Sequence, residues 1–149
     1  MHKTVRLGID VGKARIGVAR TDIDATLAVP VETVTRNGNA AEHISEIARE
    51  YSADIIYVGL PLSLKGEQTA STQDAVDFAT ELAQVTDATV RLVDERLSTI
   101  SAAQSLQSAG HTVKSSKGII DQAAAVVILE QALSIEKSTQ TWAGRALDE

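Results

Sequence analysis

The sequence contains no cysteine, which excludes disulfide bonds, thiolate catalysis and sulfur-based zinc sites. Aromatic residues make up only 3% of the chain, so a base-stacking platform for single-stranded nucleic acid is not expected. No apolar run is long enough to cross a bilayer, and the first residues lack the apolar core of a signal peptide. These absences predict a cytoplasmic protein without a membrane partner.

Positive charge is also scarce. The 14 Lys and Arg residues against 20 Asp and Glu residues give a net charge of -6, which argues against coating nucleic acid by bulk electrostatics. An enzyme that meets a phosphodiester through metal ions is not excluded. With 149 residues, 44% of them hydrophobic, the chain is typical of one globular domain. We expect this domain over 1–135 and a flexible polar tail over 136–149.

A hairpin near the start carries the most informative residue. The segment GIDVGKARIGVA predicts two short strands, Val5–Val11 and Arg15–Arg20, joined by a tight turn. Strand alternation places Asp10 on one face with Arg6 and Gly8. A buried carboxylate needs a cation, a hydrogen-bond network or solvent. Asp10 therefore indicates either a ligand site or, in the simpler interpretation, a strand-end cap for the turn.

The remaining elements follow from apolar spacing. Strands are predicted at 27–36, 54–61 and 88–94, and an amphipathic helix at 40–51. A helix over 98–109 is predicted from its caps, Ser98 and Gly110. Between the strands at 54–61 and 88–94 lies a helix capped by Ser71, with Asp74 in the capping-box position. A loop over 111–117 leads to a final apolar helix over 119–133. This order predicts an α/β fold: a five-stranded mixed sheet, three antiparallel strands followed by parallel strands, with helices on both faces.

Acidic residues occur at three places where local structure does not require a charge: within the first strand (Asp10), at the end of the fifth strand (Asp94 and Glu95) and at the apolar start of the last helix (Asp121). Asp121 could simply complement the helix dipole, and the strand-end acids could be solvated. If the three places converge, they form an oxygen-rich site without imidazole, which suits Mg²⁺ or Mn²⁺. Two such ions can drive hydrolysis of a phosphodiester.

Four segments together resemble the YqgF/RuvX family: the hairpin, VGLP with the following Gly66, VDERLST and IDQAAAVVIL. The resemblance covers about Val5 to Leu133 and implies an RNase H-like fold. It also implies a metal-dependent nuclease that is Holliday-junction-resolvase-like and linked to maturation of the 5′ end of pre-16S rRNA. The family's catalytic, metal-binding acids fall on Asp10, Glu95 and Asp121. Alternation sends Asp94 to the opposite face unless the strand is bulged.

Basic residues lie close in sequence to these acids. We expect six of them to contact phosphates: Lys13, Arg15, Lys65, Arg96, Lys114 and Lys117. The expected partner is structured RNA such as pre-rRNA, a ribosomal precursor particle, or branched DNA. The sequence leaves open the choice between RNA and DNA, between endo- and exonuclease, and between monomer and homodimer.

Two other functions remain compatible with the sequence. One is a non-catalytic nucleic-acid or ribosome-assembly binding domain of the same fold. The other is an ATP-binding module of the actin/sugar-kinase type, which opens with a similar Asp-x-Gly hairpin. That class needs a second phosphate hairpin and an adenosine site, for which 149 residues leave no room.

Overall fold

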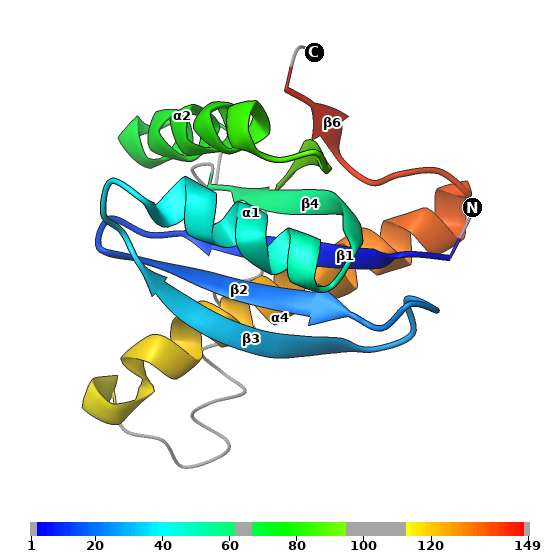
Figure 1. The fold of residues 1–149 in the computed structure, drawn as a ribbon, viewed down its shortest axis with the longest axis horizontal. Coiled ribbons are helices and arrows are strands. Elements are labelled where there is room, and N and C mark those ends of the chain that lie inside the picture. Colours follow the sequence, from blue (N-terminus) through cyan, green and yellow to red (C-terminus); the bar gives the residue numbers. More distant parts are fainter. Residues whose placement is uncertain (1–2, 62–66, 95–112, 148–149) are drawn as a thin grey trace.

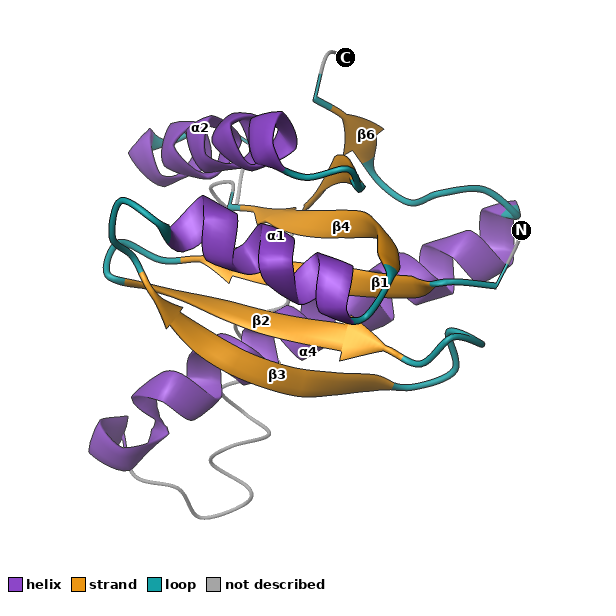
Figure 2. Ribbon diagram, in the orientation of Figure 1, coloured by secondary structure: helices purple, strands orange, loops and turns teal. Residues whose placement is uncertain are grey.

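The computed structural model describes residues 3–61, 67–94 and 113–147, and side chains of the last helix from Asp121 onward. One mixed sheet has the strand order β3-β2-β1-β4-β5-β6. Figure 1 shows the described helices on both sides of it, and Figure 2 shows the strands as one layer between them. In chain order the elements are β1 (Val5–Val11), β2 (Arg15–Thr21), β3 (Ala28–Thr35), α1 (Ala40–Glu50), β4 (Ala53–Leu60), α2 (Ala70–Val85), β5 (Thr89–Asp94), α4 (Val113–Thr139) and β6 (Arg145–Ala146).

The sheet confirms the predicted topology and adds one strand. β1, β2 and β3 pair antiparallel in sequence order, while β4 joins β1 in parallel and β5 joins β4 in parallel. β3 lies at the sheet edge, as expected from Pro30, because proline cannot donate a ladder hydrogen bond. The expected number of five strands is wrong: β6 pairs antiparallel with β5. The predicted helix over 98–109 lies outside the described residues.

Helices α1 and α2 cover one face of the sheet. Apolar residues at helical spacing, such as Ile44 on α1 and Leu82 on α2, are fully buried against Leu7 and Ile9 of β1. These strand residues alternate with those that face the other way, as the period of two requires. The exposed side of α1 carries His43, whose Nε2 lies 2.8 Å from Glu32 Oε2. His43 is thus a surface residue.

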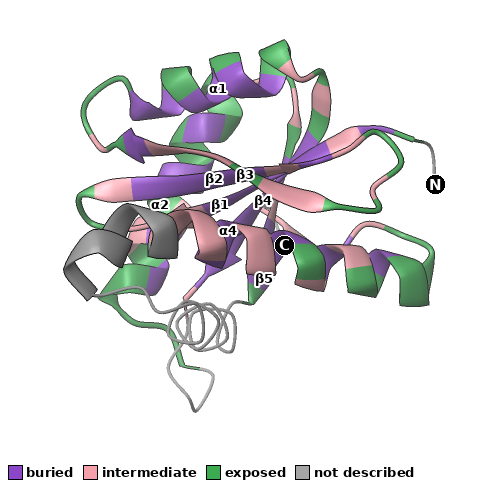
Figure 3. Ribbon diagram, turned by 90° about the horizontal axis from the view of Figure 1, so that it is seen from below, coloured by how far each residue is buried: buried purple, intermediate pink, exposed green. Residues whose placement is uncertain are grey.

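Helix α4 covers the opposite face, as Figure 3 shows with α1 and α4 on the two sides of the sheet. Several β1 and β2 residues beneath it are small. A Cβ atom on Gly8 would lie 2.6 Å from Leu129 Cγ, and Ala125 and Ala19 are fully buried in the same layer. Because side-chain bulk is missing, helix and sheet pack at short distance. Asp10 shares this face, because it follows Gly8 by two residues.

Helix α4 is longer at both ends than the sequence predicts. It begins at Val113, so the expectation of a loop over 111–117 is wrong for 113–117. The sequence there reads Val-Lys-Ser-Ser-Lys, in which no apolar periodicity indicates a helix. Figure 1 shows these first turns projecting past β3. A helix anchored on a core extends at little cost, since only nucleation is expensive.

The C-terminal segment also differs from expectation. Position 136, placed in a polar tail by the sequence, lies inside α4, and the chain then returns to form β6. Ala143 is fully buried, and the Arg6 guanidinium lies 5.1 Å from the centre of the Trp142 ring. Arg91 fixes the segment further, because its Nε donates to the Ala143 carbonyl at 2.6 Å. These partners come from β1 and β5, so local composition does not reveal them.

A buried ion pair joins the start of β1 to the end of α4. Arg6 NH2 lies 2.9 Å from Glu136 Oε1, and the two side chains are only 4% and 6% exposed. Arg6 NH1 also donates to the Thr4 carbonyl at 2.5 Å. The hydroxyl of Tyr57 donates to Glu136 and accepts from the Ala143 amide. Burial, and then the hydrogen bond to Glu136, raise the pKa of Tyr57, which keeps its hydroxyl protonated as a donor.

Replacement of Glu136 tests this network. Glu136→Ala leaves the Arg6 charge buried without its carboxylate, and we expect a loss of about 3–5 kcal/mol in unfolding free energy. Glu130→Ala, at an exposed position of the same helix, is the control and should change stability by less than about 0.5 kcal/mol. Urea denaturation measures both. Equal stability of the two variants would contradict the assigned role of the pair.

Candidate active site

Asp10 lies near the carboxyl end of β1 on the face that α4 covers. Its register partner on β2 is Gly17, and paired residues of antiparallel strands direct their side chains to the same face. Asp10 is half-buried. Because Gly17 has no side chain, another part of the chain can approach β2 closely beside Asp10.

Asp121 approaches the same point from α4. A Cβ atom on Gly17 would lie 1.9 Å from the Asp121 carbonyl oxygen, so the helix backbone rests directly on the glycine. The next residue, Gln122, donates from Nε2 to Thr33 Oγ1 of β3 at 3.0 Å. Gly17 is thus the register partner of Asp10 and also touches the main chain at Asp121, on the face of the sheet that α4 covers.

Arg15 supplies a cation to this place. Its Nε donates to Asp121 Oδ2 at 2.8 Å, and the side chains are 41% and 18% exposed, respectively. Arg15 precedes Gly17 by two residues on β2, so alternation turns it toward α4 as well. Asp121 is therefore charge-paired, which a simple complement to the helix dipole would not require.

The strand-end acids are divided by the alternation of β5. Val90 and Leu92 belong to the core beneath α1 and α2, whereas Val93 packs under α4. Asp94 follows Val93 and so takes the α1/α2 side, away from Asp10. Glu95, predicted as the third catalytic acid, lies outside the described residues. Within the described part of the chain, no group of three or more His, Cys, Asp or Glu residues forms a metal cluster.

The donors that are described fit a hard divalent cation. Asp10 and Asp121 offer carboxylate oxygens. The Asp121 carboxylate already forms an ion pair with a cationic side chain, that of Arg15. Oxygen donors are those that Mg²⁺ and Mn²⁺ prefer. His43, a histidine in the described part of the chain, is paired with Glu32 and is not a donor at this site.

The predicted phosphate-contacting residues do not all gather around these acids. Lys13, in the turn after β1, lies with Arg36, Ser71 and Asp74 around a pocket of about 370 Å³ beside α2. Lys114 and Lys117 lie in the first turns of α4, whose backbone alone is described. Lys65 and Arg96 lie outside the described residues. Of the six, Arg15 is thus the residue with a described contact to a predicted acid.

Arg36 was missed by sequence reasoning. It follows β3, and its NH1 donates to the Gly12 carbonyl at 2.9 Å, in the turn that connects Asp10 to Arg15. NH1 and NH2 also bind Asp74 at 2.6 and 2.7 Å. This bidentate pair lowers the pKa of the Asp74 carboxyl and raises the pKa of Arg36. Arg36 therefore fixes the turn to α2.

The N-cap of α2 also differs from the prediction. Thr69, rather than Ser71, is the N-cap: its side chain accepts from the Thr72 amide, and Thr72 completes the capping box. Asp74 thus has no capping role and bonds Arg36 instead. Both Thr69 and Ser71 are good N-cap residues, so composition alone could not choose between them.

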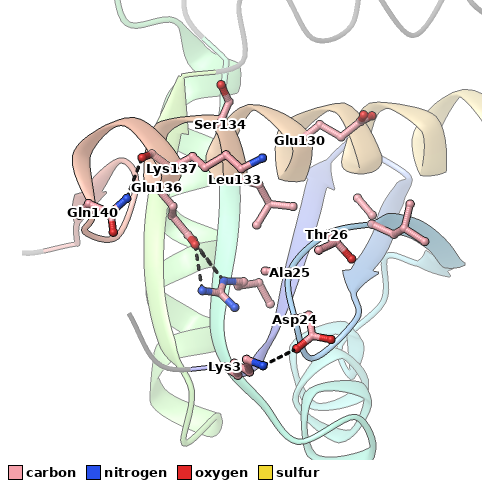
Figure 4. A pocket seen from close by; sticks show the side chains of 13 residues that line it. Lys3, Asp24, Ala25, Thr26, Glu130, Leu133, Ser134, Glu136, Lys137 and Gln140 are labelled. Atoms are coloured by element: carbon pink, nitrogen blue, oxygen red, sulfur yellow. Dashed lines mark hydrogen bonds and ion pairs between the residues drawn. The ribbon is translucent and has the colours of Figure 1, made fainter.

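A larger pocket, of about 670 Å³, lies at the other end of the sheet. Figure 4 shows its lining from the loop between β2 and β3 and from the last turns of α4, with Lys3 directed toward Asp24. The buried Glu136 carboxylate lies at its inner side. Arg6 and Ala28, at the starts of β1 and β3, also line it, so the pocket is remote from Asp10.

The fold defines the class of protein. The chain aligns with Thermus thermophilus RuvC, solved "in complex with Holliday junction substrate", at a TM-score of 0.59 and 15% identity over 91% of this chain and 97% of that one. The fowlpox virus resolvase aligns at a TM-score of 0.55 and 9% identity over 89% and 98% of the two chains. The protein has the α/β RNase H-like fold of these resolvases.

Sequence similarity narrows the class to a family. The family described as "RuvX: Holliday junction resolvase" matches residues 4–135, and the chain belongs to it. A Leifsonia xyli relative named "Putative pre-16S rRNA nuclease" is 51% identical over 99% of this chain and 97% of its own length. A Streptomyces avermitilis protein with the same name is 45% identical over 92% and 90%. No described helix is long and apolar enough to span a membrane.

Replacement of Gly17 tests the geometry that joins the two aspartates. In Gly17→Ala the new methyl group meets the Asp121 carbonyl, so α4 must shift, and we expect a loss of about 1–3 kcal/mol in stability. Gly38→Ala is the control, because nothing lies within 4 Å of a Cβ atom there. Thermal unfolding followed by circular dichroism measures both variants. Equal melting temperatures would show that α4 does not rest on Gly17.

Proposed function

We propose that the chain is a divalent-metal-dependent nuclease that hydrolyses phosphodiester bonds during maturation of the 5′ end of pre-16S rRNA. The observation that supports the proposal is that Gly17 is the register partner of Asp10 and also touches the main chain at Asp121. The names of the curated relatives support the choice of pre-16S rRNA as substrate. Branched DNA is the second substrate to test, because RuvC was solved in complex with a Holliday junction.

Asp10, Asp121 and Glu95 are the proposed ligands of Mg²⁺ or Mn²⁺ and hence the proposed catalytic residues. Glu95 is preferred to Asp94 because Asp94 takes the α1/α2 side of β5. A bound pair of ions would activate water and stabilise the leaving oxygen of the displacement. In this proposal the protein holds Asp10 and Asp121 in place through the β1–β2 pairing and the contact of α4 with Gly17.

Substrate is held in this proposal by separate basic residues: Lys13, Arg15, Lys65, Arg96, Lys114 and Lys117. Contacts to phosphates fix the position of a nucleic acid without reading its bases, so we expect recognition of shape rather than sequence. The net charge of -6 limits long-range attraction. Binding should therefore depend on the metal and decrease only gently as salt increases.

Asp10→Asn is the direct test of the proposed chemistry. The variant keeps the size of the side chain but removes a charged ligand, so cleavage of a pre-16S rRNA fragment in Mg²⁺ or Mn²⁺ should fall by at least about a hundredfold. Folding should be retained, which circular dichroism checks. A four-way DNA junction, assayed alongside the RNA, reports which substrate the site prefers.

Asp54→Asn is the matched control, since Asp54 lies at the start of β4, far along the strand from the Asp10 edge. Wild-type cleavage by both variants would leave Asp10 as the cap of its turn and favour a non-catalytic binding domain for ribosome assembly. Unfolding of Asp10→Asn with loss of activity would also favour a structural role for Asp10.

A further inference from the structure

We propose that Arg15 is a displaceable counter-ion: it neutralises Asp121 while the metal site is empty and binds a substrate phosphate once a divalent ion takes that carboxylate. The proposal rests on the proposed nuclease function. The phosphate contact expected for Arg15 then forms only after Arg15 has left Asp121. Metal binding and substrate binding are linked in this way.

The first step of the argument is that both cations need the same carboxylate. Arg15 Nε lies 2.8 Å from Asp121 Oδ2. Asp10 and the main chain at Asp121 both adjoin Gly17, and in the proposed site their two carboxylates repel each other unless a cation lies between or beside them. The guanidinium supplies that charge. A divalent ion would supply it as well, and the two cations repel each other at one carboxylate.

The second step is that the arginine, not the aspartate, is able to move. The main chain at Asp121 rests on Gly17, and its neighbour Gln122 is bonded to Thr33. Asp121 is 18% exposed, whereas Arg15 is 41% exposed and has a long side chain. An ion pair with this degree of exposure is weak enough to be broken by a competing cation.

The third step concerns the released guanidinium. Arg15 comes from the same face of β2 as Gly17, so it stays beside the metal site after exchange. The contact with Asp121 uses one of the five N–H donors of the side chain. The planar fork of donors matches two phosphate oxygens, which favours a bidentate contact to a nucleic-acid backbone.

Metal affinity of the full chain gives the first test. Arg15→Gln removes the competing cation, so Mn²⁺ affinity measured by titration calorimetry should rise about two- to fivefold, the range for a partly exposed ion pair. Lys13→Gln removes one positive charge from the same turn, yet Lys13 lies on the α2 side near Asp74. Its Mn²⁺ affinity should change by less than half as much. Equal effects of the two variants would overturn the proposal.

Binding of a labelled structured RNA gives the second test. Without metal, Arg15 is engaged by Asp121, so Arg15→Gln should bind RNA as the wild type does. With saturating Mn²⁺ it should bind RNA more weakly than the wild type does. The slope of log K against log salt concentration should decrease in magnitude by about one, the value for one phosphate contact. Lys13→Gln should weaken RNA binding equally in both conditions. A loss in Arg15→Gln that is the same with and without Mn²⁺ would overturn the exchange.

The outcomes separate this inference from the proposed function. If Asp10→Asn loses Mn²⁺ binding but Arg15→Gln behaves as Lys13→Gln, the metal site stands and the counter-ion role is wrong. If the wild-type chain binds no Mn²⁺, both proposals are wrong.

Discussion

The contact between α4 and β2 is the constraint on which the arrangement of the proposed site depends. Gly17 has no side chain, and the main chain at Asp121 occupies the space where one would be. The same small-residue surface continues through Gly8 and Ala19. The separation of helix and sheet is therefore set by the absence of side-chain atoms, and it lays the main chain at Asp121 against the register partner of Asp10.

Among the described side chains, two ion pairs hold α4 to the sheet, and their surroundings differ. Arg6 and Glu136 are almost completely buried, so separating them would leave charges in a medium of low polarity. Arg15 and Asp121 are partly exposed, and water can replace either partner. The helix thus has a buried attachment near its end and a partly exposed one near the proposed metal site.

The sequence was sufficient where the pattern is local. The hairpin, its extension through β3, α1 and the buried strand β4 follow from periods of two and 3.6. The face shared by Arg6, Gly8 and Asp10 follows from alternation alone. What the sequence did not predict depends on contacts between distant residues: Glu136 is 130 positions from Arg6, and Asp74 is 38 from Arg36. Those contacts decide where α4 ends and what Asp74 binds.

The two edges of the sheet have a consequence for how copies of the chain could associate. At one edge, Pro30 lacks an N–H group, and the pairing of β3 with β2 is irregular beside it. At the other edge, β6 offers only two residues. An incoming strand would find no long, regular ladder on either side of the described sheet, which is how natural sheets avoid edge-to-edge aggregation. Pro30 and the shortness of β6 therefore disfavour extension of the described sheet at its two edges.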